Sequence, residues 1–222
     1  MIQFKNLNLT FNPNAANEFK ALKNINLHIT KHKLVILKGV SGSGKSTLLS
    51  LISALIKPTN GEIKVDGKLI AKLPDFHASR FRSKDIGFIF QSFNLFESLS
   101  VEENIALPLI PLELSQKEID DKVNHAMKLA NIEHKKNQSV KDLSGGEKQR
   151  CAIARALVND PKIILCDEPT ANLDRTNSLA FIEVIKTLKS LEKTIVIATH
   201  DPLFEALDFV DEVINIENGE IL

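Results

Sequence analysis

The chain has 222 residues, 43% of them hydrophobic and 25% charged, which is the balance of a globular protein with a substantial core. Its 28 basic and 28 acidic residues cancel, so the basic surplus typical of nucleic-acid-binding proteins is absent and we expect no nucleic-acid partner. The chain starts without a signal peptide, and no uncharged run approaches the roughly 18 residues that span a bilayer, which predicts a cytosolic or peripheral protein. Its two cysteines, Cys151 and Cys166, follow no metal-binding spacing and are expected to be reduced packing residues.

A strand, a loop and a helix are the first elements that the pattern predicts. An apolar run at residues 34–39 ends in glycine. Behind it, four apolar residues recur at the spacing of one helix face: Leu48, Leu51, Ile52 and Leu55. An Asp-Gly step at 66–67 and an Asn-Gly step at 218–219, each between alternating apolar residues, predict two hairpins.

The pattern of apolar and polar residues changes between residues 91 and 160, where no segment has the pattern of a strand. Ser100 and Ser115 are each followed three residues later by a glutamate, which is the pattern of a helix capping box. Behind the second box, one helix face stays apolar through Ile119, Val123, Ala126, Met127 and Ala130. We expect an all-helical insert over residues 91–160.

Two continuous apolar runs return at residues 162–168 and 194–200, with a helical pattern between them. Apolar strands without alternation are typical of a parallel sheet that is covered on both faces. The sequence therefore predicts an α/β protein with a mostly parallel sheet. Residues 1–90 and 161–222 form its core, which includes the antiparallel β hairpins, and the helical subdomain is inserted between them.

The loop between the first predicted strand and helix, "GVSGSGKS", fits the phosphate-binding pattern G-x-x-x-x-G-K-[ST]. Glycines let backbone N–H groups converge on phosphate oxygens, and the following helix adds the positive end of its dipole. We expect Lys45 to reach the β- and γ-phosphates of a nucleotide and the Ser46 hydroxyl to ligate Mg²⁺. Packing or helix capping is the alternative role for Thr47. The nucleotide-binding residues expected in this loop are Gly39, Ser41, Gly42, Ser43, Gly44, Lys45, Ser46 and Thr47.

Polar residues follow three other apolar strands, where ligands gather in an open α/β sheet. Asp167 is the candidate carboxylate for the metal, and Glu168 is the candidate general base that polarises the attacking water. Gln91 is expected to reach the metal or the attacking water, and His200 the γ-phosphate. The alternative is a capped strand end for the Asp-Glu pair and plain turn residues for the other two.

A second glycine turn, Ser144-Gly145-Gly146, begins another predicted helix within the insert. Its free N–H groups and helix dipole are suited to an anion, but it has no lysine and no metal ligands of its own. The hypothesis is that it completes a site on a second copy of the chain, so that a two-fold dimer traps each nucleotide between Lys45 of one copy and Ser144 of the other.

Together these motifs resemble the ATP-binding subunit of ATP-binding cassette (ABC) transporters over essentially the whole chain. The resemblance rests on six motifs in the family's order: Walker A at 39–47, the Q-loop at Gln91, the signature "LSGGEKQR" at 143–150, Walker B at 163–168, the D-loop "ANLD" at 171–174 and the H-loop at His200. It implies a P-loop NTPase fold of ABC type with ATP and Mg²⁺ as cofactors. It also implies a head-to-tail homodimer that hydrolyses ATP through Glu168 and has Asp174 at its interface.

The resemblance also implies integral membrane permease subunits as partners and a peripheral location on the cytoplasmic face of the inner (plasma) membrane. Residues 86–109 and 167–174 look like the subgroup of the lipoprotein-releasing, macrolide-exporter and cell-division ABC ATPases. The expected function is lipoprotein release or macrolide-type export. Mechanical work on the envelope is the alternative.

The resemblance also gives a role to one aromatic residue and to one apolar cluster. Phe11 matches the ring that the family stacks against adenine, with simple packing as the alternative. Phe93, Leu95 and Phe96 either belong to the core or form a groove for a cytoplasmic helix of the membrane partner.

Two other classes of function compete with this interpretation. A small-molecule or nucleoside kinase shares the phosphate loop and Mg²⁺, but has no use for the second glycine turn or the D-loop. A soluble ABC ATPase that acts on DNA or ribosomes typically has a long coiled coil or two fused cassettes, and neither is present in this neutral chain of 222 residues.

Overall fold

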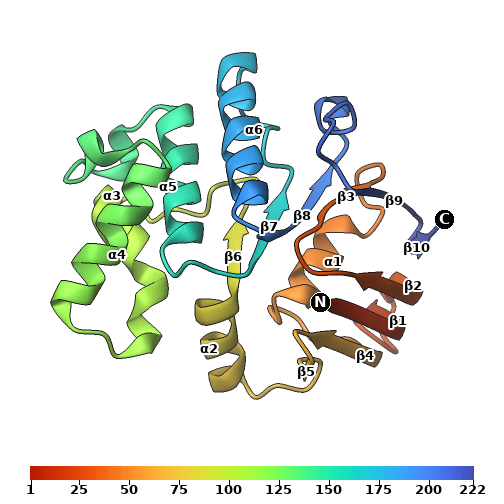
Figure 1. The fold of residues 1–222 in the computed structure, drawn as a ribbon. Helices are drawn as coiled ribbons and strands as arrows, with labels where there is room; N and C mark the ends of the chain where they lie inside the picture. Colours follow the sequence, from red (N-terminus) through yellow and green to blue (C-terminus); the bar gives the residue numbers. More distant parts are fainter.

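The computed structural model describes residues 1–222 and arranges ten strands in two sheets (Figure 1). The larger sheet is parallel apart from its edge strand β10, and its order is β10 (Glu220–Ile221), β9 (Glu212–Glu217), β3 (Leu34–Lys38), β8 (Thr194–Thr199), β7 (Ile163–Asp167) and β6 (Ile86–Ile89). The smaller sheet is antiparallel, in the order β2 (Phe19–Ile29), β1 (Ile2–Phe11), β4 (Asn60–Val65) and β5 (Lys68–Leu69). Both predicted hairpins form, and the α/β fold class is confirmed.

Six α-helices surround the larger sheet, and three of them gather at one side of it (Figure 1). They are α1 (Lys45–Ile52), α2 (Asp75–Asp85), α3 (Val101–Ala106), α4 (Gln116–Leu129), α5 (Gly145–Leu157) and α6 (Arg175–Ser190). Short 3₁₀ helices complete the set: η1 (Leu107–Leu112), η2 (Glu133–Lys135), η3 (Val140–Asp142) and η4 (Pro202–Phe204). None of the helices has both the length and the apolar character that crossing a membrane requires.

No strand forms between residues 91 and 160, where the sequence predicts helices only. Both predicted capping boxes are present: Ser100 and Ser115 accept from the backbone N–H three residues on, and the glutamate there accepts in return. Such reciprocal bonds satisfy amides that the first helical turn leaves free. Helices α3 and α4 therefore start where the sequence predicts.

Successive residues of the central strands enter two different cores. On β3, Leu34 and Ile36 belong to a cluster that includes residues of α3 to α6, whereas Val35 and Leu37 belong to a cluster shared with α1 and the antiparallel sheet. All four side chains are fully buried. Covering both faces removes the alternation that a half-exposed strand shows, which is why these strands are continuously apolar in the sequence.

The helix after the phosphate loop is shorter than predicted. Leu48, Leu51 and Ile52 are buried as expected, but α1 ends at Ile52 and Leu55 is 44% exposed. The Ser53 hydroxyl donates to backbone carbonyls of the last turn and Ala54 has a φ of 52°, so the chain leaves the helix there. The prediction that Leu55 shares the buried face was wrong.

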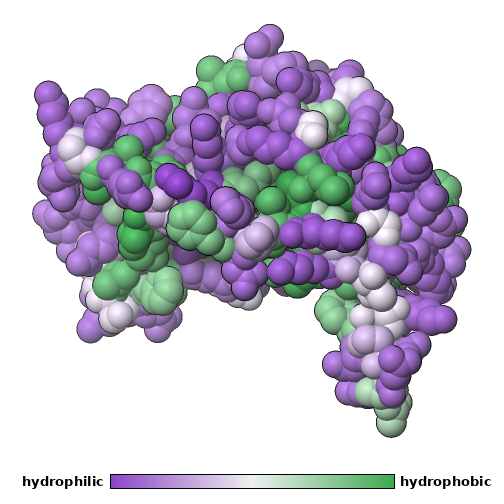
Figure 2. Space-filling model, turned by 90° about the horizontal axis from the view of Figure 1, so that it is seen from below, coloured by the Kyte–Doolittle hydropathy of each residue, from purple (hydrophilic) through white to green (hydrophobic).

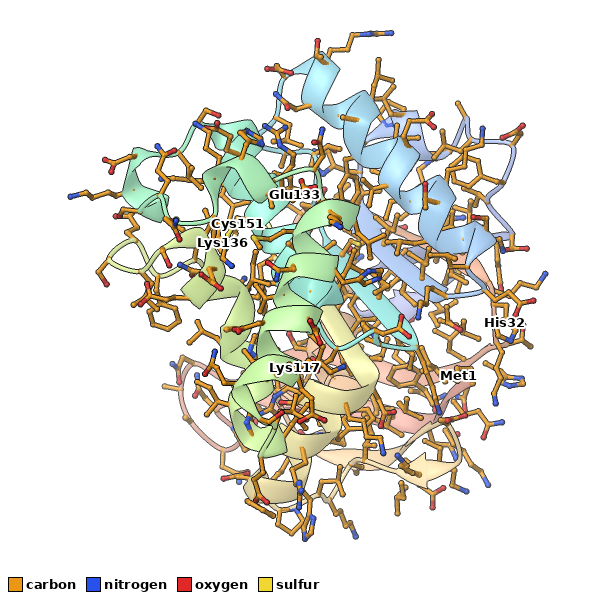
Figure 3. The ribbon with its side chains drawn as sticks, turned by 60° about the vertical axis from the view of Figure 1, so that its left-hand side comes forward. Met1, His32, Lys117, Glu133, Lys136 and Cys151 are labelled. Carbon is orange, nitrogen blue, oxygen red and sulfur yellow. The ribbon has the colours of Figure 1, made fainter.

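Both cysteines are free and buried, as predicted. Cys151 lies inside the helical lobe behind α4 (Figure 3), and burial raises the pKa of its thiol to about 12. Burial likewise raises the pKa of Cys166 on β7. Because the thiolate is the nucleophile and metal ligand, neither residue is suited to either task at neutral pH.

Candidate functional site

The phosphate loop connects β3 to α1 and depends on three glycines. Gly42 and Gly44 have φ values of 79° and 109°, in the left-handed region that favours glycine. At Gly39 a Cβ atom would lie 2.2 Å from the Ile216 carbonyl oxygen, so this position packs against β9. The loop can therefore turn its backbone toward a ligand, and α1 begins at Lys45 without a side-chain cap on its first amides.

A hollow of about 240 Å³ lies over this loop. It is lined by Phe19, Ala21, Ser41, Gly42, Ser43, Gly44, Lys45, Ser46, Thr47, Gln91 and Glu168. Within it the Ser43 hydroxyl is buried and has no hydrogen-bond partner in the protein. A buried hydroxyl without a partner is costly unless a ligand supplies one, and a phosphate oxygen fits that need.

Lys45 is only 5% exposed and lies across the mouth of the loop. Its Nζ donates to the carbonyl oxygens of Gly39 and Val40 at 2.7 and 3.1 Å, and lies 3.4 Å from Glu168 Oε1. A buried ammonium group that makes these contacts is held ready for a ligand of high negative charge. A nucleotide's terminal phosphates match that charge.

The two candidate metal ligands from distant parts of the sequence lie together. The Ser46 hydroxyl donates to Asp167 Oδ1 at 2.7 Å. Burial raises the pKa of the Asp167 carboxyl, an effect opposed by this hydrogen bond. One hydroxyl and one carboxylate fit Mg²⁺, which takes oxygen ligands and keeps waters and substrate phosphates for its other positions. No group of three His, Cys, Asp or Glu residues forms a more complete protein cage anywhere in the structure.

The Glu168 carboxylate contacts a lysine and a histidine, whereas Asp167 contacts Ser46. The φ of Glu168, 42°, is unusual for a residue other than glycine. Its Oε1 lies 2.9 Å from the His200 ring nitrogen Nδ1, and its Oε2 accepts from the His200 backbone N–H at 3.4 Å. Glu168 thus contacts both Lys45 and His200; Lys45 and Glu168 line the hollow, whereas His200 does not.

Gln91 follows β6 and reaches the same hollow. Its backbone carbonyl accepts from the Asn172 side chain at 3.0 Å. Asn172 belongs to the segment 171–174, so the residue expected at the metal is tied to the predicted D-loop. The sequence names both motifs but gives no sign of this bond.

Two exposed phenylalanine rings of the small sheet lie near the phosphate loop, and only one of them lines the hollow. Phe19, which is 58% exposed, lines the hollow, whereas Phe11 does not. The two residues are direct partners across β1 and β2, and Phe11 is 41% exposed rather than packed in the core. Because partners across antiparallel strands share one face of the sheet, the two rings form one apolar surface beside the phosphate loop. Phe19 was missed because the turn between them separates it from the matched position in sequence.

The second glycine turn lies outside this hollow. None of Ser144, Gly145 and Gly146 lines it. Ser144 instead caps α5 through a third capping box with Glu147, and Asp174 caps α6 through its bond to the Asn177 N–H. Within one chain the structure does not bring these four predicted nucleotide-binding residues to the phosphate loop.

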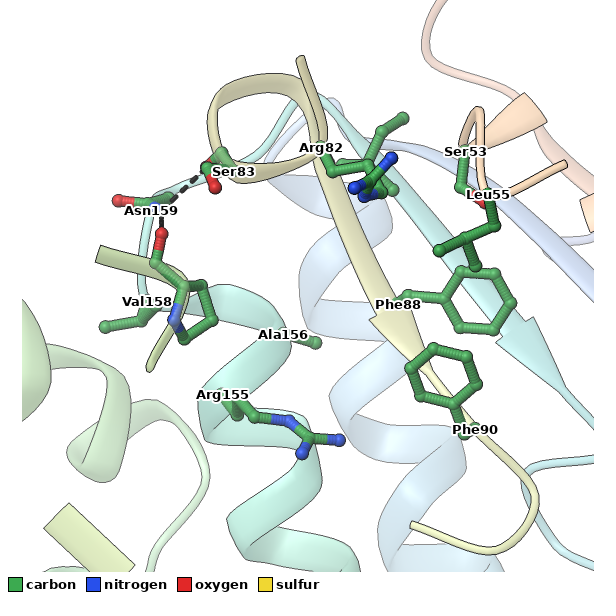
Figure 4. A pocket seen from close by; sticks show the side chains of 12 residues that line it. Ser53, Leu55, Arg82, Ser83, Phe88, Phe90, Arg155, Ala156, Val158 and Asn159 are labelled. Atoms are coloured by element: carbon green, nitrogen blue, oxygen red, sulfur yellow. Dashed lines mark hydrogen bonds between the residues drawn. The ribbon is translucent and has the colours of Figure 1, made fainter. Parts of the chain in front are cut away.

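A groove of about 220 Å³ is lined by residues of α2, β6, the end of α5 and the segment after α1 (Figure 4). Its apolar floor is the stacked pair Phe88 and Phe90, with ring centroids 4.0 Å apart, and Arg82 and Arg155 line it as well. Seen from below, apolar side chains gather near the centre of the molecule and again on the left of the view, with mostly polar side chains around them (Figure 2).

The residues that the sequence offers for a partner-binding groove do not line this one. Phe93, Leu95 and Phe96 do not line it, and Leu95 packs against the core cluster of the helices. The chain turns at Phe93 and Asn94, which have φ values of 61° and 49°. Their carbonyls accept from the guanidinium of Arg155. Left-handed geometry at a phenylalanine is rare, and the sequence pattern does not reveal it.

The fold and the hollow define a P-loop nucleoside triphosphatase: a glycine loop between a strand and a helix, a buried lysine and a Ser-Asp pair suited to Mg²⁺. Comparison with known proteins narrows the class. The family model described as ABC transporter matches residues 22–171. The chain belongs to the ABC transporter family, and it is an ATPase of the ATP-binding cassette type.

The names of individual relatives refer to different transported substrates and to opposite directions of transport. The methionine import ATP-binding protein MetN of Aliivibrio fischeri is 42% identical over 223 residues, covering 100% of this chain and 64% of that protein. The macrolide export ATP-binding/permease protein MacB of Mannheimia succiniciproducens is 40% identical, covering 100% of this chain and 34% of that protein. The chain thus spans less than two thirds of the length of either relative.

Among solved structures, the ATP-binding cassette MJ0796 in a dimeric post-hydrolysis state, bound to ADP and Pi, superposes with a TM-score of 0.90. It is 38% identical, and the match covers 100% of this chain and 96% of that chain.

Proposed function

We propose that this ATPase is the energy-providing subunit of a membrane transporter and that two copies close head to tail on two ATP molecules with Mg²⁺. The observation that carries the proposal is the separation of the two glycine turns. The phosphate loop has a lysine and a buried hydroxyl without a partner, whereas the turn at Ser144–Gly146 lies outside that hollow. A second copy in a two-fold dimer offers the missing half of each site.

The residues of the phosphate loop divide the work of holding the nucleotide. Backbone amides of the loop and the Ser43 hydroxyl bind phosphate oxygens, and Lys45 exchanges its carbonyl contacts for the β- and γ-phosphates. Ser46 and Asp167 hold Mg²⁺, which neutralises charge on the phosphates when it is bound. The rings of Phe19 and Phe11 lie on the side where the base extends.

Glu168 is the proposed general base for the attacking water. It is oriented by His200, whose ring nitrogen and backbone N–H both face its carboxylate. Gln91 senses the filled site through its bond to Asn172, and it directly follows Phe90, two residues beyond the end of β6. The apolar groove at Phe88 and Phe90 then receives a cytoplasmic helix of an integral membrane permease, which gives the chain a peripheral location on the cytoplasmic face of the membrane.

For the cargo we propose outward movement, either lipoprotein release or macrolide-type export, on the basis of the subgroup resemblance. Relatives named for import and for export match this chain with similar identity. The membrane partner therefore has to identify the cargo. Mechanical work on the envelope by a cell-division-type ATPase is the alternative.

The test is a pull-down of tagged Glu168→Gln protein from detergent-solubilised membranes in the presence of ATP, with mass spectrometry of what is recovered. Loss of the general base keeps the dimer closed and lengthens the life of the complex. We expect a multi-spanning membrane protein to be recovered with the tagged chain. A Phe88→Glu variant serves as the control and is expected to recover much less of it. Recovery of soluble or nucleic-acid partners alone, with an intact dimer, overturns the transporter role and leaves the ATPase.

A further inference from the structure

The two glycines of the second turn have different surroundings. A Cβ atom added to Gly145 would meet nothing within 4 Å. One added to Gly146 would lie 2.5 Å from Oδ1, 2.8 Å from Cγ and 3.0 Å from Nδ2 of Asn177. There is therefore open space beside Gly145. At Gly146 a side chain would clash with the carboxamide of Asn177, so only glycine fits there.

Asn177 is also bound to the residue that ends the D-loop. Its backbone N–H donates to Asp174 Oδ1 at 2.8 Å, which caps α6, and its side-chain Nδ2 donates to Asp174 Oδ2 at 3.0 Å. The Asp174 carboxylate is thus held at both oxygens by one residue. This fixes the direction in which the D-loop enters α6.

On its other side Asn177 faces α5. Arg150, one turn after Gly146, approaches Asn177 Oδ1 with Nη1 at 3.5 Å. The preceding residue, Gln149, is 3% exposed and donates from Nε2 to the Pro169 carbonyl oxygen at 3.1 Å. The start of α5 is therefore anchored at two places, to the segment after β7 through Pro169 and to the first turn of α6 through Asn177.

We propose that Asn177 is a positioning residue that joins the signature turn and the D-loop of one chain into a single surface, so that both meet the partner's nucleotide together. The proposal rests on the head-to-tail dimer described above. Asn177 contacts the inner glycine of the turn, Gly146, and leaves the outer one, Gly145, open. It acts through Gly146 and Asp174 and needs no contact with ATP.

The first test measures ATP-driven dimerisation in the Glu168→Gln background, by light scattering after size exclusion. Asn177→Ala removes two side-chain hydrogen bonds, so we expect the dimer dissociation constant to rise about tenfold or more. Binding of a fluorescent ATP analogue to the monomer is expected to stay within about twofold, because the phosphate loop is untouched. Thr176→Ala, an exposed neighbour in the same helical turn, is the matched control and leaves both constants unchanged.

A second variant guards against loss of folding. Asn177→Asp keeps the side-chain volume and the acceptor for Arg150, but removes the donor to Asp174 and sets two carboxylates side by side. We expect a melting temperature close to that of the parent and a dimer weakened as in Asn177→Ala. Dimerisation of both variants equal to that of Thr176→Ala overturns the proposal.

Mixed dimers test whether the residue acts across the interface. In a dimer of a Lys45→Ala chain with a Ser144→Arg chain, the one complete site combines the phosphate loop of the second with the signature turn of the first. Adding Asn177→Ala to the Lys45→Ala chain is expected to lower the ATPase rate of this site about tenfold, and adding it to the Ser144→Arg chain to leave the rate unchanged. Equal effects in both positions overturn the proposal. Failure of Glu168→Gln protein to dimerise with ATP overturns the dimer itself, which distinguishes the two failures.

Discussion

The two glycine turns of this chain begin helices in the same way but leave different groups free. In the first turn, Gly42 and Gly44 adopt left-handed geometry, α1 has no side-chain cap, and the Ser43 hydroxyl has no partner. In the second turn, the backbone N–H and the hydroxyl of Ser144 both donate to Glu147 Oε2 at 2.8 Å. The first turn is arranged around a ligand, and the second already holds a carboxylate of its own.

That carboxylate is negative under all ordinary conditions. Hydrogen bonds from the Ser144 backbone and hydroxyl, helped by Lys135, lower the pKa of Glu147 to about 2. An incoming phosphate meets this charge at the N-terminal end of α5, where the helix dipole alone would attract it. The second turn is therefore a weak anion site by itself, and its contribution depends on a nucleotide that the other chain already holds.

The largest effect is expected when one turn is broken in each of two chains. Lys45→Ala removes the charge that the phosphates need, and Ser144→Arg fills the second turn, so each variant alone should lose at least about a hundredfold in kcat. An equal mixture should recover about a quarter of the parent activity, because half of randomly formed dimers contain one complete site. ATPase assays of the separate and mixed proteins check this, and a mixture as inactive as its components would place both turns in the same chain's site.

Smaller substitutions separate binding from closure. Ser43→Ala deletes the buried hydroxyl of the first turn and should raise the Kd of the monomer for ATP about tenfold. Ser144→Ala should leave that Kd unchanged and lower kcat instead, since it affects only the closed dimer. Calorimetric titration of the Glu168→Gln versions at low protein concentration gives the Kd, and steady-state ATPase assays give kcat. If Ser144→Ala weakens ATP binding to the monomer, the contrast between the turns is lost.

The aromatic rings that the antiparallel sheet places beside the hollow can be tested separately from the phosphate loop. Phe19→Ala should lower the affinity for ATP about tenfold, the usual value of a stacked base, and leave the affinity for inorganic tripolyphosphate unchanged. Phe11→Ala should have a smaller effect because Phe11 does not line the hollow. Phe76→Ala, at an exposed ring on α2, is the control. A larger effect of Phe11→Ala than of Phe19→Ala would restore the position that the family pattern indicates.

Residues close in sequence were the ones that could be predicted. The phosphate loop, the capping boxes and the apolar strands follow from short-range patterns, and the structure forms all of them. The end of α1 could not be predicted, because nothing in the local sequence indicates that Ala54 adopts a left-handed backbone conformation. The place of Phe19 depends on the register between β1 and β2, and the groove at Phe88 and Phe90 depends on how α2, β6 and α5 pack together. These contacts join residues far apart in the chain, as does the contact between Gly146 and Asn177.

The smallest expected effect concerns the charge in the second turn. Glu147→Gln can keep the hydrogen bonds to Ser144 but removes the negative charge at the start of α5. In the Glu168→Gln background it should strengthen the ATP-bound dimer about threefold, the size of a single dipole interaction. A weaker or unchanged dimer, measured beside a Glu133→Gln control on the exposed η2, would mean that the charge of Glu147 does not oppose the partner's phosphate.

The same substitution has a signature in the pH dependence of folding. Because the pKa of Glu147 is lowered in the folded chain, its ionised form stabilises the fold above its ordinary pKa of 4.5, and this contribution is lost as the pH falls toward about 2. Glu147→Gln lacks this contribution at every pH. Thermal unfolding should therefore show the parent chain more stable at neutral pH and the two chains converging between about pH 4.5 and 2. Parallel curves over that range would show that the capping box does not depend on the charge.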